Sequence, residues 1–402
     1  MITARAFEGK NYAVYGLARS GLATAAALIS SGAEVIAWDV KEEARAKAPA
    51  GVRIANLDEI DLAQFDSLVV TPGLPLNRHP IARRARAADV EIIGDIELFA
   101  RARAGLPAHK VVGITGTNGK STTTALVHHI LKTAGLPTTM GGNIGLPILA
   151  QDPLAEGGVY VLELSSYQID LAQSLDCDVA VLLNITPDHL DRYESFEAYA
   201  QAKERLLAMS SGLIVRGRDD VGLDQSHWPA LQGPHNAQNA AAAIETCRHL
   251  GVGEGEIEEG LRTYPGLPHR MERIREKDGT LFVNDSKATN PTATAPALAA
   301  FERIRWICGG LAKTDNLDEC APHFGRVAKA YTIGEASELF AGLLSPHMSV
   351  AECETLERAV GAAAAEAQSG DTVLLSPACA SFDQFRDFED RGDRFRALVG
   401  AL

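Results

Sequence analysis

Apolar runs, each followed by a glycine-containing loop and then a helix-like stretch, recur along the chain. The first example occupies residues 11–39, which read NYAVYG, LARSGLATAAALISSG and AEVIAWD. This pattern predicts a strand, a helix that ends near Gly32, and a second strand. Two more apolar runs, FDSLVVTPG and VEIIG, predict further strands between residues 65 and 94. Strands and helices that alternate in this way are typical of a parallel sheet covered by helices.

The same pattern starts again twice further along the chain. Residues 109–135, HKVVGITGTNGKSTTTALVHHILKTAG, place an apolar strand, a glycine-rich loop and a helix in order. We interpret GLPHR at 266–270 as a linker, because TLFVN, RIRWICGG, KAYTIG and TVLLS after it predict strands with alanine-rich helices between them. We therefore predict three α/β domains, over residues 1–98, 99–267 and 268–402.

Composition and charge narrow the class of protein. The formal charge is −14, and both nucleic acids and anionic membranes require basic surface, so we expect neither as a partner. The six cysteines form no CxxC pair, and their scatter is typical of reduced thiols in a cytoplasmic protein. The first residues, MITARAFEGKN, contain no apolar segment of a signal peptide. No apolar run approaches the roughly 18 residues of a membrane span.

The segment GITGTNGKST at 113–122 resembles a phosphate-binding loop between a strand and a helix. Such a loop needs small residues whose backbone N–H groups converge on phosphate oxygens, a lysine for the β- and γ-phosphates, and a hydroxyl for Mg²⁺. Lys120 and Ser121 fit the last two roles. The spacing departs from the strict form, because Ile114 stands where the first glycine is expected. The alternative is a glycine-rich turn that contains a Lys-Ser pair by chance. The predicted strand before this segment and the predicted helix after it favour an ATP site in a P-loop ATPase-like domain.

Polar residues at two strand ends are candidates for the same site, because ligands of α/β sheets lie outside the carboxyl ends of the strands. Glu163 ends the run VYVLE, where a carboxylate can hold Mg²⁺ or its water. His189 lies in NITPDHLDRY, just past another apolar run. The alternatives are a solvated glutamate at a strand end and a polar residue at a helix start.

The first glycine loop reads G-x-A-x-x-G from Gly16 to Gly21, and Asp39 ends the next predicted strand. Taken alone, this arrangement is typical of a Rossmann-like domain that binds the diphosphate of NAD at a helix N-terminus. Two other functions therefore remain alternatives at this point: an NAD-dependent dehydrogenase and a non-enzymatic P-loop regulator.

Eight segments in order along nearly the whole chain resemble the Mur ligases, ATP-dependent amide ligases of cytoplasmic peptidoglycan synthesis. They are GTNGKST, GGNIG (141–145), LELSSYQ (162–168), NITPDHLDRY (184–193), HNAQNAAAA (235–243), GLPHR (266–270), NDSKATNP (284–291) and LLSPACASFDQF (374–385). NDSKATN together with SPACASFDQF is similar to the members that add D-glutamate. The resemblance implies a monomer with Rossmann-like first and third domains, whose substrates are ATP, UDP-N-acetylmuramoyl-L-alanine and D-glutamate.

The resemblance assigns roles at the ATP site. It implies that Lys120, His189 and Lys203 are catalytic, and that two Mg²⁺ ions bind at Ser121, Glu163, His189 and Lys203. Lys203 falls at the carbamylated lysine of the family, and carbamylation would turn an ammonium that repels metal into a carboxylate-like ligand. From the residues alone, Lys203 in AYAQAKERLL reads as an exposed helix lysine. The implied ATP-binding residues are Gly116, Thr117, Asn118, Gly119, Lys120, Ser121, Thr122, Asn236, Asn239, Arg270, Asp285 and Lys287.

The resemblance also assigns the other two substrates. It makes the first loop a site for a UDP-sugar diphosphate in place of NAD. The implied UDP-substrate residues are Arg19, Ser20, Asp39, Thr71, Gly73, Asn143 and His189. The implied D-glutamate residues are Lys313, Ser381 and Phe388, of which the cation and the hydroxyl suit carboxylates.

Two features depart from the family pattern. Residues 309–315 read GGLAKTD, and Leu311-Ala312 replaces the more glycine-rich or acidic residues common there. The stretch between residues 211 and 234 is shortened. The nearest rival, a folylpolyglutamate-synthase-like enzyme, shares the P-loop type and the ligase chemistry, but it lacks the leading domain that residues 1–98 are expected to form.

Overall fold

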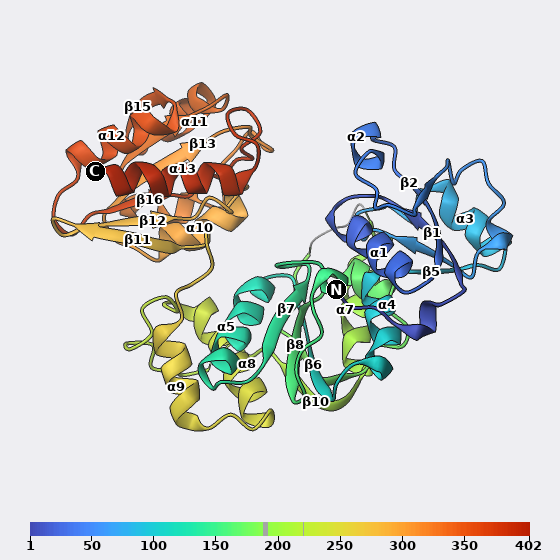
Figure 1. Cartoon of the computed structure of the whole chain (residues 1–402). Coiled ribbons are helices and arrows are strands. Elements are labelled where there is room, and N and C mark those ends of the chain that lie inside the picture. Colours follow the sequence, from blue (N-terminus) through green and yellow to red (C-terminus); the bar gives the residue numbers. More distant parts are fainter. Residues whose placement is uncertain (188–191, 220) are drawn as a thin grey trace. The chain divides into compact units, whose positions relative to one another are not determined.

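The computed structural model describes residues 1–187, 192–219 and 221–402, and these form two compact units. The first unit contains Met1–Asp224 and Pro234–Tyr264, and the second contains Gln225–Gly233 and Pro265–Leu402. The first unit holds two sheets and the second holds one (Figure 1). The predicted class, α/β with parallel sheets, is confirmed, while the boundaries near residues 98 and 267 stay predictions.

The first sheet has the strand order β3-β2-β1-β4-β5, and all of its strands are parallel. Its strands are β1 (Asn11–Tyr15), β2 (Glu34–Trp38), β3 (Arg53–Ile54), β4 (Ser67–Val70) and β5 (Glu91–Ile93). The helices of this part are α1 (Arg19–Ser30), α2 (Glu42–Arg45), α3 (Pro80–Ala87) and α4 (Asp95–Ala102). This is the order of a Rossmann-like half, in which loops after β1 and β4 meet at one edge.

The second sheet has the order β10-β9-β6-β8-β7 and is also parallel. Its strands are β6 (His109–Thr115), β7 (Thr138–Gly142), β8 (Gly158–Glu163), β9 (Cys177–Leu182) and β10 (Ser210–Arg216). The helices are α5 (Lys120–Thr133), α6 (Ser166–Asp170), α7 (Phe196–Ala208), α8 (Pro234–His249) and α9 (Glu254–Thr263). The central strand β6 carries the glycine-rich loop, so β8 and β9 place their ends beside it.

A continuous core explains why the first two sheets form one unit. Apolar side chains from both sheets belong to one buried cluster, which includes Val14 of β1 and Tyr160 of β8. Polar contacts add to it, since Glu97 of α4 accepts hydrogen bonds from the backbone N–H groups of Gln173 and Ser174 at 2.6 and 2.8 Å. Burial of this apolar surface holds the two sheets in one arrangement.

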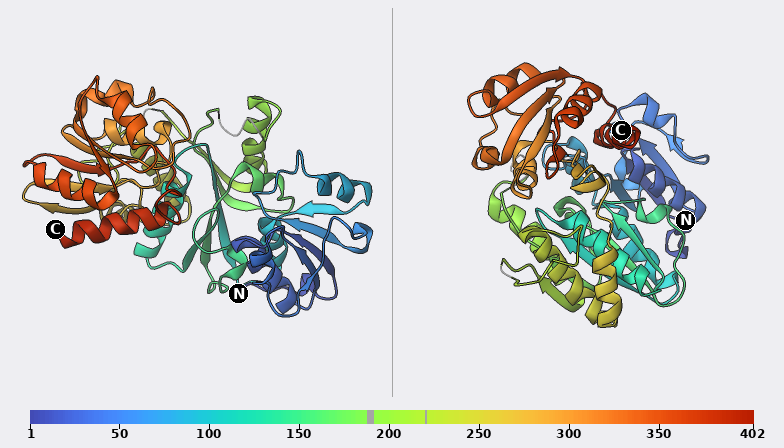
Figure 2. Two further views of the ribbon diagram at one scale, coloured as in Figure 1. Left: turned by 90° about the horizontal axis from the view of Figure 1, so that it is seen from above. Right: turned by 90° about the vertical axis from the view of Figure 1, so that its left-hand side faces the viewer.

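The third sheet has the order β11-β12-β16-β13-β14-β15, in which only the β11–β12 pair is antiparallel. Its strands are β11 (Glu272–Lys277), β12 (Thr280–Asn284), β13 (Ile304–Gly309), β14 (Val327–Ile333), β15 (Ser349–Glu354) and β16 (Thr372–Leu375). The helices are α10 (Pro291–Ala299), α11 (Ser337–Leu344), α12 (Leu356–Glu366) and α13 (Phe388–Ala401). Trp306 packs with α10 and α11, and the next residue, Ile307, packs with α12 and α13 (the red helix in Figures 1 and 2).

Short 3₁₀ segments complete the described structure. They lie at Arg5–Phe7, Leu62–Gln64, Arg103–Gly105, Ile148–Ala150 and Ala321–Arg326.

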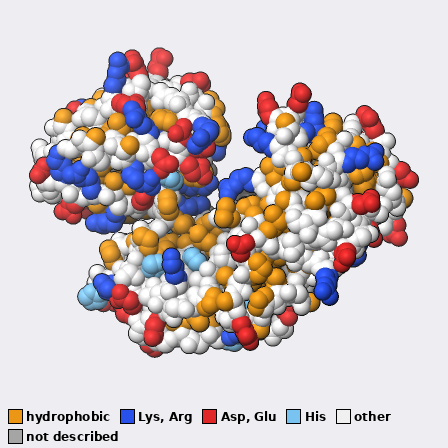
Figure 3. Space-filling model, in the orientation of Figure 1, with side chains coloured by type: hydrophobic (Ala, Val, Ile, Leu, Met, Phe, Trp, Pro, Cys, Tyr) orange, Lys and Arg blue, Asp and Glu red, His pale blue; other side chains and the backbone are white. Residues whose placement is uncertain are grey.

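All six cysteines are buried and free. On the face that Figure 3 shows, acidic and basic side chains are interspersed over both units. No helix among the described residues is long and apolar enough to cross a membrane.

Candidate active site

The glycine-rich loop after β6 is shaped by its glycines. Gly119 has a φ of +83° and precedes α5, and a Cβ at this position would lie 2.3 Å from Oδ1 of Asn239. A larger residue would therefore push the loop away from α8. Nζ of Lys120 donates to the carbonyl oxygens of Gly116 and Thr117 at 2.9 and 2.8 Å. The ammonium lies inside the loop, where a phosphate-binding loop needs its positive charge.

Neighbouring elements hold this loop from two sides. Asn184, which follows β9, exchanges two hydrogen bonds with the backbone of Asn118, at 2.8 and 3.1 Å. On the other side, Oδ1 of the buried Asn239 accepts from Thr123 at 3.2 Å, and Nδ2 of Asn239 donates to Asn236 at 3.3 Å. The two asparagines predicted to bind ATP therefore lie at the start of α8, against the loop. Ser121 and Thr122 are half-buried in the first turn of α5.

The carboxylate of Glu163 has one oxygen without a hydrogen-bond partner among the described residues. Glu163 ends β8, beside Ile114 of β6, and is only 2% exposed. Its Oε1 accepts from Nδ2 of Asn143 at 3.1 Å, while its Oε2 is buried with no such partner. A buried carboxylate oxygen without a partner is unfavourable unless a cation or a donor binds it. The residues present therefore fit a Mg²⁺ ion held by one carboxylate, a hydroxyl and phosphate oxygens.

Lys203 is buried beside the same loop. Its side chain on α7 is 2% exposed, so the interpretation as an exposed helix lysine is wrong. Its Nζ donates to the carbonyl oxygen of Gly116 at 2.9 Å, which is also a partner of Lys120, and it lies 4.8 Å from the ring centroid of Tyr199. Two lysine side chains thus converge on one loop carbonyl. His189 lies outside the described residues, which contain no cluster of three or more His, Cys, Asp or Glu side chains suited to a metal.

The loops of the first sheet are tied together by Asp39. Its Oδ2 accepts from the backbone N–H of Leu17 at 2.7 Å, and its Oδ1 accepts from the backbone N–H of Lys41 at 2.9 Å. The loop after β1 lies close to the loop after β4, since a Cβ at Gly16 would lie only 2.4 Å from Oγ1 of Thr71. These contacts place the predicted residues Ser20, Thr71 and Gly73 at one edge of the sheet.

Arg19 connects this edge to the second sheet. Its guanidinium donates to the carbonyl oxygen of Gly145 at 2.8 Å. Gly145 is two residues after Asn143, whose backbone N–H donates to the carbonyl oxygen of Glu163 at 2.8 Å. The predicted UDP-substrate residue Arg19 is therefore linked, through the 143–145 segment, to the end of β8.

The predicted site residues of the second unit lie near the carboxyl ends of β12, β13 and β16. Asp285 is buried and accepts from Oγ of Ser376 at 2.8 Å and from the backbone N–H of Met271 at 3.2 Å. Burial raises the pKa of Asp285 to about 7. Nζ of Lys287 lies 3.8 Å from the ring centroid of Phe388. Arg270 is exposed just before β11.

The predicted D-glutamate residues also lie at this edge. Nζ of the exposed Lys313 donates to Oγ1 of Thr289 at 3.2 Å. Leu311, part of the departure at 309–315, forms an isolated bridge with Ala380, next to the buried Ser381. The sheet edge thus brings cations, hydroxyls and one aromatic ring together, which suits an anionic ligand.

Two arginines of importance to these loops were not predicted as site residues, although Arg192 lies in the segment NITPDHLDRY that carries the family resemblance. Arg391 of α13 is buried and donates to the backbone carbonyl oxygens of Ser286 and Cys379 at 2.9 and 3.1 Å. Arg192 donates to carbonyl oxygens of the loop after β4. Both arginines bind backbone carbonyl oxygens. Every residue has such an oxygen, so the sequence does not indicate which residues an arginine will bind.

Two family models match long segments of the chain, one in each compact unit except for a few residues. The model described as Mur ligase middle domain matches residues 114–228, and the model described as Mur ligase, glutamate ligase domain matches residues 269–379. The chain belongs to the Mur ligase family. The predicted family is therefore confirmed, and with it the prediction of an enzyme.

Relatives of this Mur ligase match over the whole chain. It is 58% identical to the UDP-N-acetylmuramoylalanine–D-glutamate ligase of Novosphingobium aromaticivorans, over 100% of this chain and 97% of that one. It is 57% identical to the enzyme of the same name from Sphingopyxis alaskensis, over 100% of both chains. A solved structure of UDP-N-acetylmuramate–alanine ligase from Thermotoga maritima has a TM-score of 0.61 at 19% identity, over 98% of this chain and 99% of that one, which shows a shared fold.

Proposed function

We propose that this chain adds D-glutamate to UDP-N-acetylmuramoyl-L-alanine in peptidoglycan precursor synthesis, with conversion of ATP to ADP and phosphate. The observation that carries the proposal is the full-length identity of 58% to a UDP-N-acetylmuramoylalanine–D-glutamate ligase. The loop with Lys120 and the buried, partly unpaired carboxylate of Glu163 support it, because phosphoryl transfer depends on positive charge around the phosphates. We further propose that the chain acts as a cytoplasmic monomer of three domains, divided near residues 98 and 267.

The first step of the proposed reaction makes the substrate carboxylate reactive. A carboxylate oxygen attacks the γ-phosphorus of ATP, the bond from that phosphorus to the β,γ-bridging oxygen breaks, and an acyl phosphate and ADP form. In the proposal, Lys120 and the backbone N–H groups of Gly116 to Ser121 hold the β- and γ-phosphates, and Asn143 orients the reacting carboxylate. Asn236, Asn239, Arg270, Asp285 and Lys287 bind the rest of the nucleotide.

Metal binding completes the proposed ATP site. Bound Mg²⁺ neutralises charge on the transferred phosphoryl group. We propose that Ser121 and Glu163 hold one ion and that His189 and a carbamylated Lys203 hold a second. The burial of Lys203 supports this role, because an ammonium there costs desolvation that a metal-bound carbamate would offset.

The second step forms the amide. The amine of D-glutamate attacks the carbonyl carbon, a tetrahedral intermediate forms, and the carbon–oxygen bond to phosphate breaks while a base removes a proton from the nitrogen. We propose that Lys313 and Ser381 bind the carboxylates of D-glutamate and that Phe388 packs on its chain. Arg19, Ser20, Asp39, Thr71 and Gly73 hold the UDP portion of the other substrate.

An isotope experiment tests this reaction. The purified chain receives ATP, Mg²⁺, D-glutamate and UDP-N-acetylmuramoyl-L-alanine labelled with ¹⁸O in its free carboxylate. The proposal predicts that one labelled oxygen appears in the released phosphate and that the UDP product gains the mass of glutamate minus that of H₂¹⁸O, since one ¹⁸O leaves with the phosphate. Released phosphate that carries no label would contradict the acyl phosphate, and the absence of any UDP product would contradict the ligase activity.

A further inference from the structure

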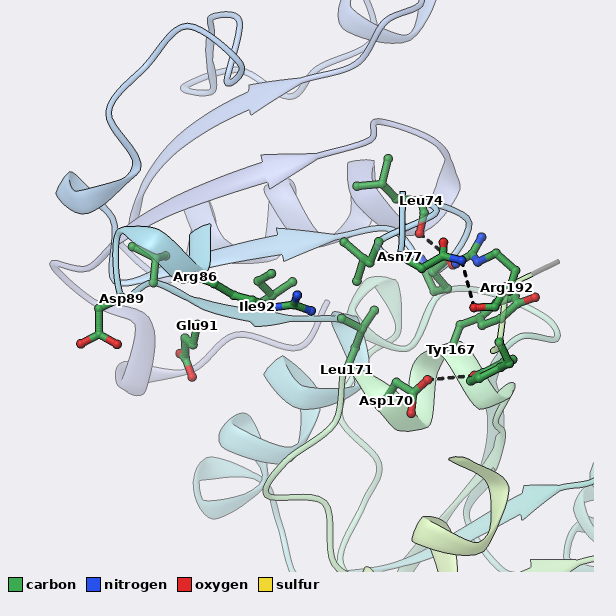
Figure 4. A pocket seen from close by; sticks show the side chains of 14 residues that line it. Leu74, Asn77, Arg86, Asp89, Glu91, Ile92, Tyr167, Asp170, Leu171 and Arg192 are labelled. Atoms are coloured by element: carbon green, nitrogen blue, oxygen red, sulfur yellow. Dashed lines mark hydrogen bonds between the residues drawn. The ribbon is translucent and has the colours of Figure 1, made fainter. Parts of the chain in front are cut away.

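Arg192 bridges the two sheets of the first unit. Its Nη1 donates to the carbonyl oxygen of Gly73 at 3.1 Å, and its Nη2 donates to those of Pro72 and Leu74 at 3.3 and 2.8 Å. In return, Nδ2 of Asn77 donates to the carbonyl oxygen of Arg192 at 3.1 Å (Figure 4). One side chain from the connection between β9 and α7 therefore binds three successive carbonyl groups of the loop after β4, here named the 72–74 loop.

The guanidinium of Arg192 is itself held in place by aromatic rings. Its Cζ lies 4.1 Å from the ring centroid of Tyr167, and the rings of Tyr167 and Tyr193 stack at 6.0 Å with an interplanar angle of 16°. Tyr167 belongs to α6, which begins just after Glu163 and is fixed by a capping box between Ser165 and Gln168. A planar guanidinium on a ring face has little freedom to reorient, so the end of β8 determines where Arg192 lies.

The contacts continue from these rings to the ATP loop. The rings of Tyr193 and Tyr199 lie 5.5 Å apart, and the hydroxyl of Tyr199 is 3.1 Å from Oγ1 of Thr117. Oγ1 of Thr117 also accepts from the backbone N–H of Thr186 at 3.0 Å. A contiguous set of side chains thus joins the 72–74 loop to the glycine-rich loop after β6.

On the side of Arg192, the 72–74 loop borders a cavity. This cavity has a volume of about 680 Å³, and its lining includes Pro72, Leu74, Tyr167 and Arg192 (Figure 4). A loop beside a cavity lacks close-packed neighbours there, so its conformation depends on the hydrogen bonds that reach it. The three bonds from Arg192 are charge-assisted and therefore stronger than neutral ones.

We infer that Arg192 is a positioning residue for the UDP-linked substrate, because it sets the 72–74 loop relative to the ATP loop. This inference rests on the proposed function, in which Thr71 and Gly73 border the UDP portion. Arg192 does not touch the reacting atoms in this account. It acts through the loop, so its loss weakens binding of one substrate and leaves the binding of the other two unchanged.

Two substitutions test the inference in the full chain. Arg192→Lys keeps the charge but lacks the planar fork, and Arg192→Ala removes both. We expect the KM for UDP-N-acetylmuramoyl-L-alanine to rise roughly 10-fold or more in both variants. The KM values for ATP and D-glutamate are expected to stay within about twofold. Arg205→Lys is the matched control, because Arg205 donates to Ala172 beside α6 at 3.2 Å and has no hydrogen bond with the 72–74 loop.

A second pair of variants separates positioning from general stability. Tyr167→Phe keeps the ring under the guanidinium, whereas Tyr167→Leu removes it, so only the leucine variant is expected to share the raised KM for the UDP-substrate. Melting temperatures and calorimetric binding of the UDP-substrate accompany the kinetics. An active parent chain whose KM is unchanged in Arg192→Lys and Arg192→Ala, or whose three KM values rise together, overturns the inference alone. A parent chain that neither turns over nor binds the UDP-substrate overturns the proposed function as well.

Discussion

The side-chain amide of Asn143 donates to Oε1 of Glu163 over 3.1 Å, and the second oxygen of that carboxylate is buried without a hydrogen-bond partner among the described residues. Asn143 thereby fixes the carboxylate and leaves one oxygen for a ligand. Because the carboxylate ends β8 beside the strand that carries the ATP loop, a cation at this oxygen would lie close to the bound phosphates. This relationship makes Glu163 the residue on which the proposed metal site depends.

Glu163→Gln is expected to reduce kcat about 100-fold or more and to raise the Mg²⁺ concentration at half-maximal activity. The amide has nearly the shape of the carboxylate but lacks the charge that binds the ion. In the absence of Mg²⁺ the variant is expected to melt no lower than the parent, because a buried carboxylate with one oxygen unpaired among the described residues has been replaced by a neutral amide. The exposed Glu156 provides the control substitution Glu156→Gln. Activity titrations with Mg²⁺ measure the effect, and an unchanged titration would remove Glu163 from the metal site.

Lys203→Ala is expected to be nearly inactive, with partial recovery when short-chain carboxylic acids are added. The added acid would replace the carboxylate-like group of a carbamylated lysine. Lys132→Ala, on the exposed side of α5, is the control. Activity with and without added acid is measured beside the melting temperature of each variant. Full activity of Lys203→Ala would disprove the carbamate role.

Lys313→Met is expected to raise the KM for D-glutamate roughly 10- to 100-fold and to leave the KM for ATP unchanged. The lysine is proposed to bind a carboxylate of this substrate, and loss of a charge-assisted hydrogen bond costs about 1.5–3 kcal/mol. The control is Lys329→Met. Lys329 lies on β14 of the same unit, and its Nζ forms an ion pair with a carboxylate oxygen of Glu366 at 2.9 Å. Initial rates at varied concentrations of D-glutamate and of ATP give the two KM values. An equal rise in both would argue for a general defect of the second unit.

Asp95→Asn is expected to flatten the dependence of stability on pH. Burial raises the pKa of Asp95 to about 6 from its usual 3.8. A raised pKa in the folded state favours folding below pH 4, and this contribution is lost as pH rises through 6. The shift corresponds to about 3 kcal/mol, so the variant should melt higher than the parent at pH 8 and about equally at pH 4. A constant difference between the two melting curves from pH 4 to 8 would show that Asp95 does not titrate in this way.

The sequence predicts the strand–loop–helix units and the edge at which the site lies. Residues 109–135 form β6, the loop and α5 in the expected order, and Glu163 ends β8 as expected. These outcomes follow from local patterns, since alternating strands and helices build parallel sheets whose carboxyl ends share one edge. The position of Glu163 relative to the ATP loop needs only this rule and the pairing of neighbouring strands.

Other parts of the site depend on contacts between distant residues. The burial of Lys203 arises where α7 packs on β6 and β9, and nothing within AYAQAKERLL distinguishes a buried lysine from an exposed one. The bonds of Arg192 to residues 72–74 join positions more than 110 residues apart, and their acceptors are backbone atoms. The antiparallel strand β11 was not predicted either, because ERIREK is polar and lies at the edge of its sheet.

The choice of D-glutamate as the added amino acid is tested most directly by ADP release from the purified chain with ATP, Mg²⁺ and UDP-N-acetylmuramoyl-L-alanine. D-Glutamate, L-glutamate, L-lysine and meso-diaminopimelate are offered in turn. We expect that D-glutamate alone strongly stimulates release and that a UDP product with one added glutamate forms in equal amount. Equal stimulation by L-glutamate or by either diamino acid, or no release with D-glutamate, would contradict this expectation.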